Sequence, residues 1–272
     1  MRRVLVATDF SEGSRAALRR AFALAGRHGV DVTVVHAAPP GLGVELVEAA
    51  SRALRDLVRD AAVPVEAVVA TGSVGPEVVA EAERRQAGLV VVGARGAHRP
   101  RDLFPGSTAE QVVELSPVPV LVVKRAGGSA YSLALCAVDA TSRSFRAARS
   151  GLALTRGTPY LLLHGVTVLG ENLLRLTGAD DRAIRELRRG QLAVARPEVE
   201  RLAAGLTPAP AEVLVEAGRP EDLVPDLADR RGADLVVVGV ERGSGLRHAL
   251  IGSVSRHALR EAPCDVLVVP LT

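Results

Sequence analysis

The chain has 272 residues, a net charge of +3 and a hydrophobic content of 48%. It contains four phenylalanines, two tyrosines and no tryptophan, too few rings for a protein that stacks nucleic-acid bases, and its arginines are spread along predicted helices as on a solvated face. No stretch approaches the ~20 apolar residues that span a bilayer, no signal sequence precedes the first strand, and the two cysteines have neither metal-ligand nor disulfide-framework spacing. We therefore expect a cytoplasmic protein that binds neither nucleic acid nor a membrane.

Short valine-rich runs alternate with longer amphipathic segments along the first half of the chain. The apolar runs are continuous, which is typical of parallel strands covered by helices on both faces. They predict strands at 3–8, 31–36, 65–70, 89–93 and 120–124, and helices at 12–28, 44–61, 76–87 and 107–115.

The second half follows the same order, with strands predicted at 132–138, 160–165, 211–217, 234–239 and 265–270. Its extra length lies at 169–204, where leucines alternate with arginine and glutamate. This pattern predicts core-facing amphipathic helices, interrupted at Gly178 and Gly190, with a partner or membrane surface as the alternative.

The two halves are also similar residue by residue. Leu89-Val90-Val91-Val92-Gly93 is repeated as Leu235-Val236-Val237-Val238-Gly239, at an offset of 146 positions. Because solenoid units have only roughly 20–50 residues, this repeat indicates a duplicated domain. We predict an α/β protein with two tandem doubly wound, Rossmann-like domains, 1–125 and 130–272, each a five-stranded parallel sheet with helices on both faces.

Glycines follow the fourth strand of the first half, in the spacing Gly93-x2-Gly96-x9-Gly106-Ser107. Ligands of doubly wound sheets bind beyond the carboxyl ends of the strands, where glycine lets backbone amides approach an anion and a helix N-terminus adds further donors. Arg95 makes the loop more cationic. Taken singly, Gly93 is better interpreted as a strand end and Ser107 as a helix cap, but their combined spacing predicts a phosphate-binding loop.

Other phosphate and catalytic motifs are absent from the sequence. The single lysine, Lys124, is not part of GxxxxGK[ST], the turn after the first strand is not GxGxxG, and there is no GxSxG elbow. This excludes a P-loop NTPase and argues against a dinucleotide-dependent dehydrogenase. We identify no catalytic residue and no metal site made by the protein alone.

Polar residues at the strand ends have two interpretations each. Asp9 either caps the following helix or contacts a ribose or a Mg²⁺-phosphate, whereas for Asp139 the cap is favoured. His36 and His164 end apolar strands and are interpreted as structural histidines.

The glycine spacing, together with Thr8-Asp9-Phe10-Ser11 and Val35-His36-Ala37, resembles the universal stress protein family, and the second half is similar to that family too. The resemblance implies a tandem member that binds ATP, with or without Mg²⁺. It implies that Asp9 lies near the ribose and phosphates and that the backbone of Ala37 meets the adenine. The phosphates would be surrounded by Gly93, Arg95, Gly96, Gly106, Ser107 and Thr108.

The second half departs from the family pattern. The corresponding residues are Asp139, Gly165, Gly239, Arg242, Gly252, Ser253 and Ser255. Arg242 stands where the middle glycine is expected, and Glu241 adds a carboxylate where phosphate would bind. We therefore expect a weakened or lost second site.

These observations lead to one functional hypothesis and two alternatives. The hypothesis is a cytosolic stress-response regulator that binds an adenine nucleotide mainly in its first domain. The alternatives are a nucleotide-free regulator of the same fold and a slow ATP hydrolase. An unpaired apolar edge strand invites pairing, so the two copies are expected to pack as an intramolecular pseudo-dimer through Val120–Val123 and Val266–Val269, with further homodimerisation as an open possibility.

Overall fold

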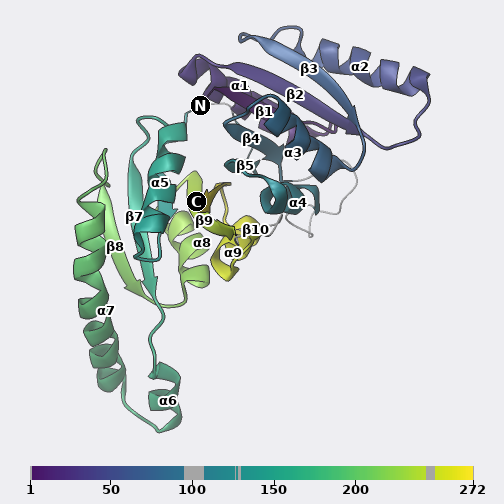
Figure 1. Cartoon of the computed structure of the whole chain (residues 1–272). Coiled ribbons are helices and arrows are strands. Elements are labelled where there is room, and N and C mark those ends of the chain that lie inside the picture. Colours follow the sequence, from purple (N-terminus) through teal and green to yellow (C-terminus); the bar gives the residue numbers. More distant parts are fainter. Residues whose placement is uncertain (1, 95–106, 126, 128–129, 243–248, 272) are drawn as a thin grey trace.

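One sheet of eleven strands runs through the part of the chain that the computed structural model describes, which is residues 2–94, 107–125, 127, 130–242 and 249–271 (Figure 1). The strand order is β3-β2-β1-β4-β5-β11-β9-β6-β7-β8, with β10 paired to β9 outside this path. The predicted α/β class, with two doubly wound halves, is confirmed.

The first half contains β1 (Arg3–Ala7), α1 (Glu12–His28), β2 (Asp31–Ala38), α2 (Val44–Val58), β3 (Val65–Thr71), α3 (Val74–Arg84), β4 (Leu89–Gly93), α4 (Ser107–Leu115) and β5 (Val120–Val123). Its five strands are parallel, as predicted. The helices α2 and α3 end earlier than the apolar pattern indicated, at Val58 and Arg84.

The second half contains β6 (Ala134–Ala137), α5 (Ser142–Leu154), β7 (Tyr160–Val166), α6 (Glu171–Leu176), α7 (Asp181–Ala203), β8 (Glu212–Ala217), α8 (Pro220–Arg230), β9 (Leu235–Arg242), β10 (Ala249–Leu250), α9 (Ser253–Glu261) and β11 (Asp265–Leu271). Five of its strands are parallel to one another. The short β10 is antiparallel to β9 and was not predicted.

Side chains of successive strand residues enter two apolar layers, one on each face of the sheet. In β4, Leu89 and Val91 pack in the layer that includes α1 and α5, whereas Val90 and Val92 pack in the layer of α3, α4, α8 and α9. Both layers contain residues of both halves. This two-sided burial explains why the strands are continuously apolar.

The two halves meet at β5 and β11, which pair antiparallel with Leu121 opposite Leu267. This is the strand pairing that the sequence predicted. Both leucines are buried, and burying a leucine side chain contributes about 1.5–3 kcal/mol. Because each half is internally parallel and the seam is antiparallel, the carboxyl ends of the two sets of strands face opposite edges of the sheet.

A buried polar cluster lies beside this seam and joins residues of both halves. Asp265 of β11 is fully buried, and its Oδ1 accepts hydrogen bonds from the backbone amides of Lys124 at 2.8 Å and Arg125 at 3.1 Å. Its Oδ2 accepts a bond of 2.8 Å from the hydroxyl of Tyr131 and lies 3.3 Å from Nε of Arg20. The Arg20 guanidinium covers the Tyr131 ring, 4.1 Å from its centre.

Burial and the Asp265 carboxylate raise the pKa of Tyr131 well above its usual value, so this hydroxyl remains a donor. The Lys124 ammonium group reaches α9 of the other half and donates to the carbonyls of Ala258 at 3.1 Å and Ala262 at 2.7 Å. A charged donor at a helix C-terminus is favourable. The cluster therefore connects the seam to the helix α9.

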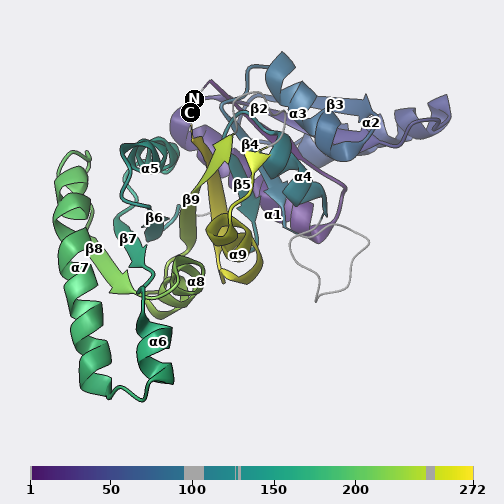
Figure 2. The ribbon, with the colours of Figure 1, turned by 60° about the horizontal axis from the view of Figure 1, so that its bottom comes forward.

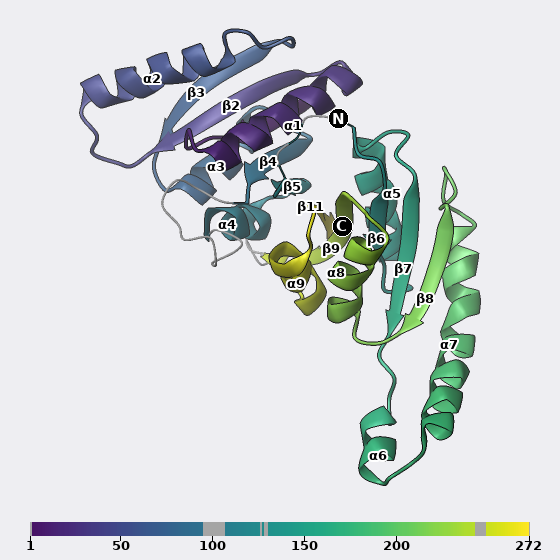
Figure 3. The same ribbon diagram turned by 180° about the vertical axis from the view of Figure 1, so that it is seen from behind.

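The extra length of the second half forms an arm made of α6 and the adjoining end of α7, which projects beyond the sheet (Figures 2 and 3). Gly178, with φ of 76°, separates the two helices, but Gly190 lies inside α7, so the interruption predicted there is wrong. The core-facing interpretation holds for Ile184 and Val199, which are buried. It fails for Leu176, which is 85% exposed.

One carboxylate holds the arm together. Glu171 accepts hydrogen bonds from Arg188 at 2.6 and 2.8 Å and from Arg175 at 2.9 and 3.2 Å. These bonds lower the pKa of Glu171 to about 2, from 4.5. The stabilisation is therefore fully present above pH 4.5 and is lost as the pH falls towards 2.

We expect the Glu171 carboxyl carbon to titrate near pH 2 in an NMR titration. Glu171→Gln is expected to increase amide exchange in α6 by about two- to five-fold, a small effect because the arginines are exposed. The matched control is Glu186→Gln, which removes one exposed pair with Arg182 on α7. A normal titration of Glu171, or equal changes in both variants, would contradict this prediction.

Candidate functional site

The turn after β1 is organised by Asp9 and Ser11. The N-cap of α1 is Ser11, whose hydroxyl oxygen accepts a bond of 3.2 Å from the amide of Ser14. Asp9 Oδ1 in turn accepts from the amide of Ser11 at 3.0 Å and from its hydroxyl at 2.5 Å. Between them Phe10 has a left-handed φ of 64°. Asp9 therefore orients the cap residue and is not itself the cap.

The turn after β6 repeats this arrangement. Thr141 caps α5, and Asp139 Oδ1 accepts from its amide at 3.0 Å and from its hydroxyl at 2.6 Å, with Ala140 at φ of 62°. The prediction that Asp139 caps the helix is wrong by two positions. Burial raises the pKa of Asp139, but hydrogen bonds with Ser144 and Thr141 outweigh it and bring the pKa below its usual value. Asp139 is therefore ionised at neutral pH.

The two histidines at the ends of β2 and β7 make equivalent contacts. Nδ1 of His36 lies 2.9 Å from the carbonyl oxygen of Thr8, and Nδ1 of His164 lies 2.9 Å from that of Val138. Each ring thus connects two neighbouring strands at the carboxyl edge. These contacts support the interpretation of both residues as structural histidines.

The candidate site of the first half lies at the carboxyl edge of β2, β1 and β4, which are neighbours in the sheet. This is the point where the strand order reverses, so Asp9, Ala37 and Gly93 follow or end adjacent strands. Ser107 opens α4 and is exposed, and Thr108 follows it. Three further predicted residues lie outside the described residues: Arg95, Gly96 and Gly106.

Gly93 has a packing reason to be glycine. A Cβ atom at this position would lie 2.8 Å from both the carbonyl carbon and oxygen of Gly13, at the start of α1. Since the contact is with backbone, the glycine is required here whether or not a ligand binds.

In the second half the predicted residues surround a cavity of about 410 Å³. Six of the seven line it, and the side chain of the seventh, Arg242, is outside what the structure describes. Those six are Asp139, Gly165, Gly239, Gly252, Ser253 and Ser255. Sequence reasoning missed Pro220 and Leu271 as lining residues, since neither carries a motif.

The loop after Gly239 differs from its counterpart. β4 ends at Gly93, whereas β9 continues to Arg242. Glu241 is paired on both edges, with Leu271 of β11 and with Leu250 of β10. Its backbone therefore belongs to the sheet and is not directed at a ligand. The exposed Glu241 carboxylate lies 3.9 Å from Nη1 of Arg143, which belongs to α5.

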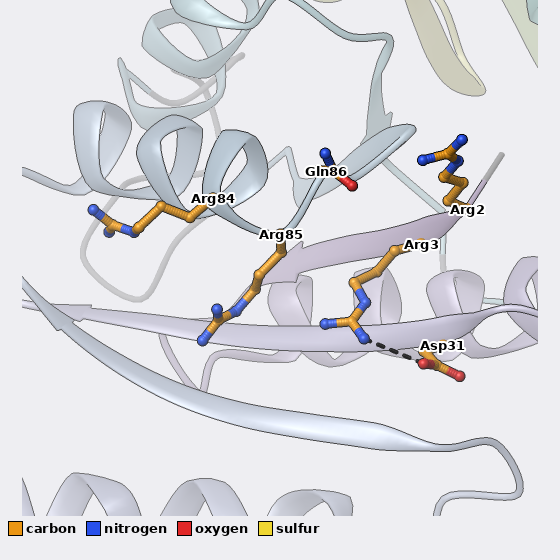
Figure 4. A pocket seen from close by; sticks show the side chains of 6 residues that line it. All are labelled: Arg2, Arg3, Asp31, Arg84, Arg85 and Gln86. Atoms are coloured by element: carbon orange, nitrogen blue, oxygen red, sulfur yellow. Dashed lines mark hydrogen bonds and ion pairs between the residues drawn. The ribbon is translucent and has the colours of Figure 1, made fainter.

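A second, open cavity of about 430 Å³ lies at the opposite end of β1, where arginines gather (Figure 4). Three of its four arginines, Arg3, Arg84 and Arg85, are ion-paired with carboxylates. Arg3 pairs with Asp31 at 3.2 Å, and Arg84 and Arg85 both pair with Glu81. The paired carboxylates compete with any phosphate for these guanidinium groups.

The described ranges contain neither a metal site made by histidine, cysteine or acidic side chains nor a membrane-spanning helix. No group of three or more histidine, cysteine, aspartate or glutamate side chains there could hold a metal ion. None of the helices described is long and apolar enough to cross a membrane.

The fold and the edge sites define the class, a tandem pair of doubly wound α/β domains. The model of the universal stress protein family matches residues 1–124 and again residues 131–270. The chain therefore belongs to the universal stress protein family and carries two of its domains in tandem.

Solved structures support the same fold. The crystal structure of a universal stress protein from Archaeoglobus fulgidus matches with a TM-score of 0.72 and 20% identity, covering 99% of this chain and 98% of that one. A putative universal stress protein from Pseudomonas aeruginosa matches with a TM-score of 0.65 and 21% identity, covering 99% and 93%.

Relatives of higher identity match only segments. A putative universal stress protein from Staphylococcus haemolyticus is 41% identical over 59 residues, which is 21% of this chain and 36% of that protein. Universal stress protein E from Salmonella typhi is 38% identical over 55 residues, which is 20% of this chain and 18% of that protein. The chain thus aligns with well under two thirds of the length of either relative.

Proposed function

We propose that the chain is a stress-response regulator that binds ATP mainly in its first domain, at the carboxyl edge of β2, β1 and β4. The observation that carries this proposal is the difference between the two loops. β4 ends at Gly93, but β9 continues in the sheet to Arg242 and adds the carboxylate of Glu241. A phosphate loop needs backbone amides that are not paired within a sheet.

In this proposal Asp9 approaches the ribose and phosphates, and the backbone of Ala37 meets the adenine. The helix α4 directs its amino end at the phosphates through Ser107 and Thr108. The motif residues Gly93, Arg95, Gly96 and Gly106, three of them outside the described part, complete the cradle. Mg²⁺ would arrive with the nucleotide.

The proposal also includes the domain organisation of the chain. The domains would extend over 1–125 and 130–272 and act as an intramolecular pseudo-dimer through β5 and β11, in the cytosol. The proposal has no catalytic step, since the sequence of the loop contains no lysine.

The site is tested by Ser107→Asp, compared with Ser253→Asp at the equivalent position of the second domain. Both serines are exposed at the start of a helix, where a carboxylate is tolerated or favourable for folding. Ser107→Asp is expected to weaken ATP binding by at least about 100-fold, because two charge-assisted contacts of about 1.5–3 kcal/mol each are lost. Ser253→Asp should leave the calorimetric affinity unchanged.

Equal ATP affinity in the wild type and Ser107→Asp would refute the first-domain site. Loss of binding in Ser253→Asp alone would place the nucleotide in the second domain. Nucleotide released on denaturing the purified protein provides an independent measure of occupancy, and none at all, with no calorimetric binding, would favour a nucleotide-free regulator.

A further inference from the structure

The cavity of the second domain combines apolar walls with a polar edge. Its apolar side chains come from four strands and α8 and α9: Ala137, Val138, Leu163, Val238, Leu271, Pro220, Val224 and Val254. The polar edge includes Asp139, His164 and Ser253. A volume of about 410 Å³ is within the range of small-molecule sites, which is about 300–1,000 Å³.

The described lining of this cavity is acidic. Asp139 and Glu241 both line it, and its described lining contains neither lysine nor arginine. Nη1 of Arg143, on α5, lies 3.9 Å from the Glu241 carboxylate. The amino end of α9 also lines the cavity, but a helix dipole supplies only about +0.5 charge, less than the two carboxylates carry.

Backbone groups at the end of β9 are also less available to a phosphate. Glu241 is held in the sheet by both β10 and β11, and the Ser255 hydroxyl donates to the carbonyl of Gly239 at 2.9 Å. Leu271 covers Gly239 so closely that a Cβ there would lie 2.7 Å from its Cδ2. Strand pairing and the Leu271 side chain thus occupy the backbone of Glu241 and the surroundings of Gly239 at this end of β9.

We infer that this cavity binds a nucleoside that carries no phosphate, an inference that rests on the adenine-nucleotide site proposed for the first domain. An aromatic base matches the valine and leucine walls, and ribose hydroxyls are donors that the Asp139 carboxylate accepts. Each added phosphate brings charge towards Glu241, a carboxylate whose counterpart in the first domain is Arg95. The two domains therefore rank the same family of ligands in opposite order, ATP first in one and adenosine first in the other.

The experiment measures adenosine and ATP binding by calorimetry in the Ser107→Asp variant of the full chain, where the first-domain site is weakened. Adenosine is expected to bind at least about ten-fold more tightly than ATP. Asp139→Ala should abolish adenosine binding, whereas Asp9→Ala, the equivalent change in the first domain, should not. Circular dichroism and thermal unfolding of both variants show whether the turns remain folded.

Glu241→Gln distinguishes an effect of the Glu241 charge on ligand binding from a purely structural effect. It removes one repelling charge from an exposed side chain, so ATP binding in the second domain should strengthen about five- to ten-fold at low salt while adenosine binding stays within about two-fold. Tighter binding of ATP than adenosine in the Ser107→Asp background would overturn the inference. So would the absence of saturable adenosine binding, or its loss in Asp9→Ala instead of Asp139→Ala.

The two proposals fail separately. The first-domain site fails if Ser107→Asp leaves ATP binding unchanged, and the second-domain inference fails on the adenosine measurements with Asp139 and Glu241.

Discussion

Asp265→Ala is expected to lower the free energy of unfolding by about 3–5 kcal/mol, because it removes one partner of a buried, hydrogen-bonded charge cluster. The substitution leaves the amides of Lys124 and Arg125 and the hydroxyl of Tyr131 without their acceptor and leaves Arg20 beside an apolar side chain. Chemical denaturation followed by circular dichroism measures the loss.

The matched control is Asp31→Ala. Asp31 also pairs with an arginine, Arg3 at 3.2 Å, but its side chain is 51% exposed. Pairs of this kind contribute about 0–1 kcal/mol. If both variants lose the same stability, the cluster at the seam is not a principal source of stability.

Gly93→Ala is expected to destabilise the first domain by about 1–3 kcal/mol, because the new Cβ meets the backbone of Gly13, which cannot move without shifting α1. Gly239→Ala, the equivalent change in the second domain, should cost clearly less. Its Cβ meets the end of the Leu271 side chain, which can adopt another rotamer. Urea unfolding of the two variants gives the comparison.

A larger loss for Gly239→Ala than for Gly93→Ala would show that Leu271 is more rigidly held than the helix start. It would also weaken the packing explanation for Gly93.

The strands and the seam were predictable because their signals are repeated and simple. Continuous apolar runs identified both sets of parallel strands, and the apolar edge strands β5 and β11 indicated where the halves meet. The β9 extension was not predictable, since Glu241 and Arg242 are charged residues that indicate a loop. They are held in the sheet by pairing with β10 and β11, whose residues come later in the chain.

Local backbone conformation limited the prediction at the candidate sites. Asp9 and Asp139 directly follow or lie near a strand end and have good capping side chains, so a cap was a reasonable interpretation. The left-handed residues Phe10 and Ala140 delay each helix by two positions, and neither residue type signals that conformation. At Gly190 the sequence predicted an interruption where the helix α7 continues, because a glycine inside a long helix costs only about 1 kcal/mol of stability.

The reversal of strand direction at β5 and β11 has a consequence for communication between the domains. A ligand bound beyond the strand ends of one half and a ligand bound beyond those of the other lie on opposite margins of a single sheet. They never touch, and neither blocks the other's path to solvent. Any effect of one on the affinity of the other must pass through the protein between them, where Asp265 and Lys124 connect the seam to the C-terminal end of α9.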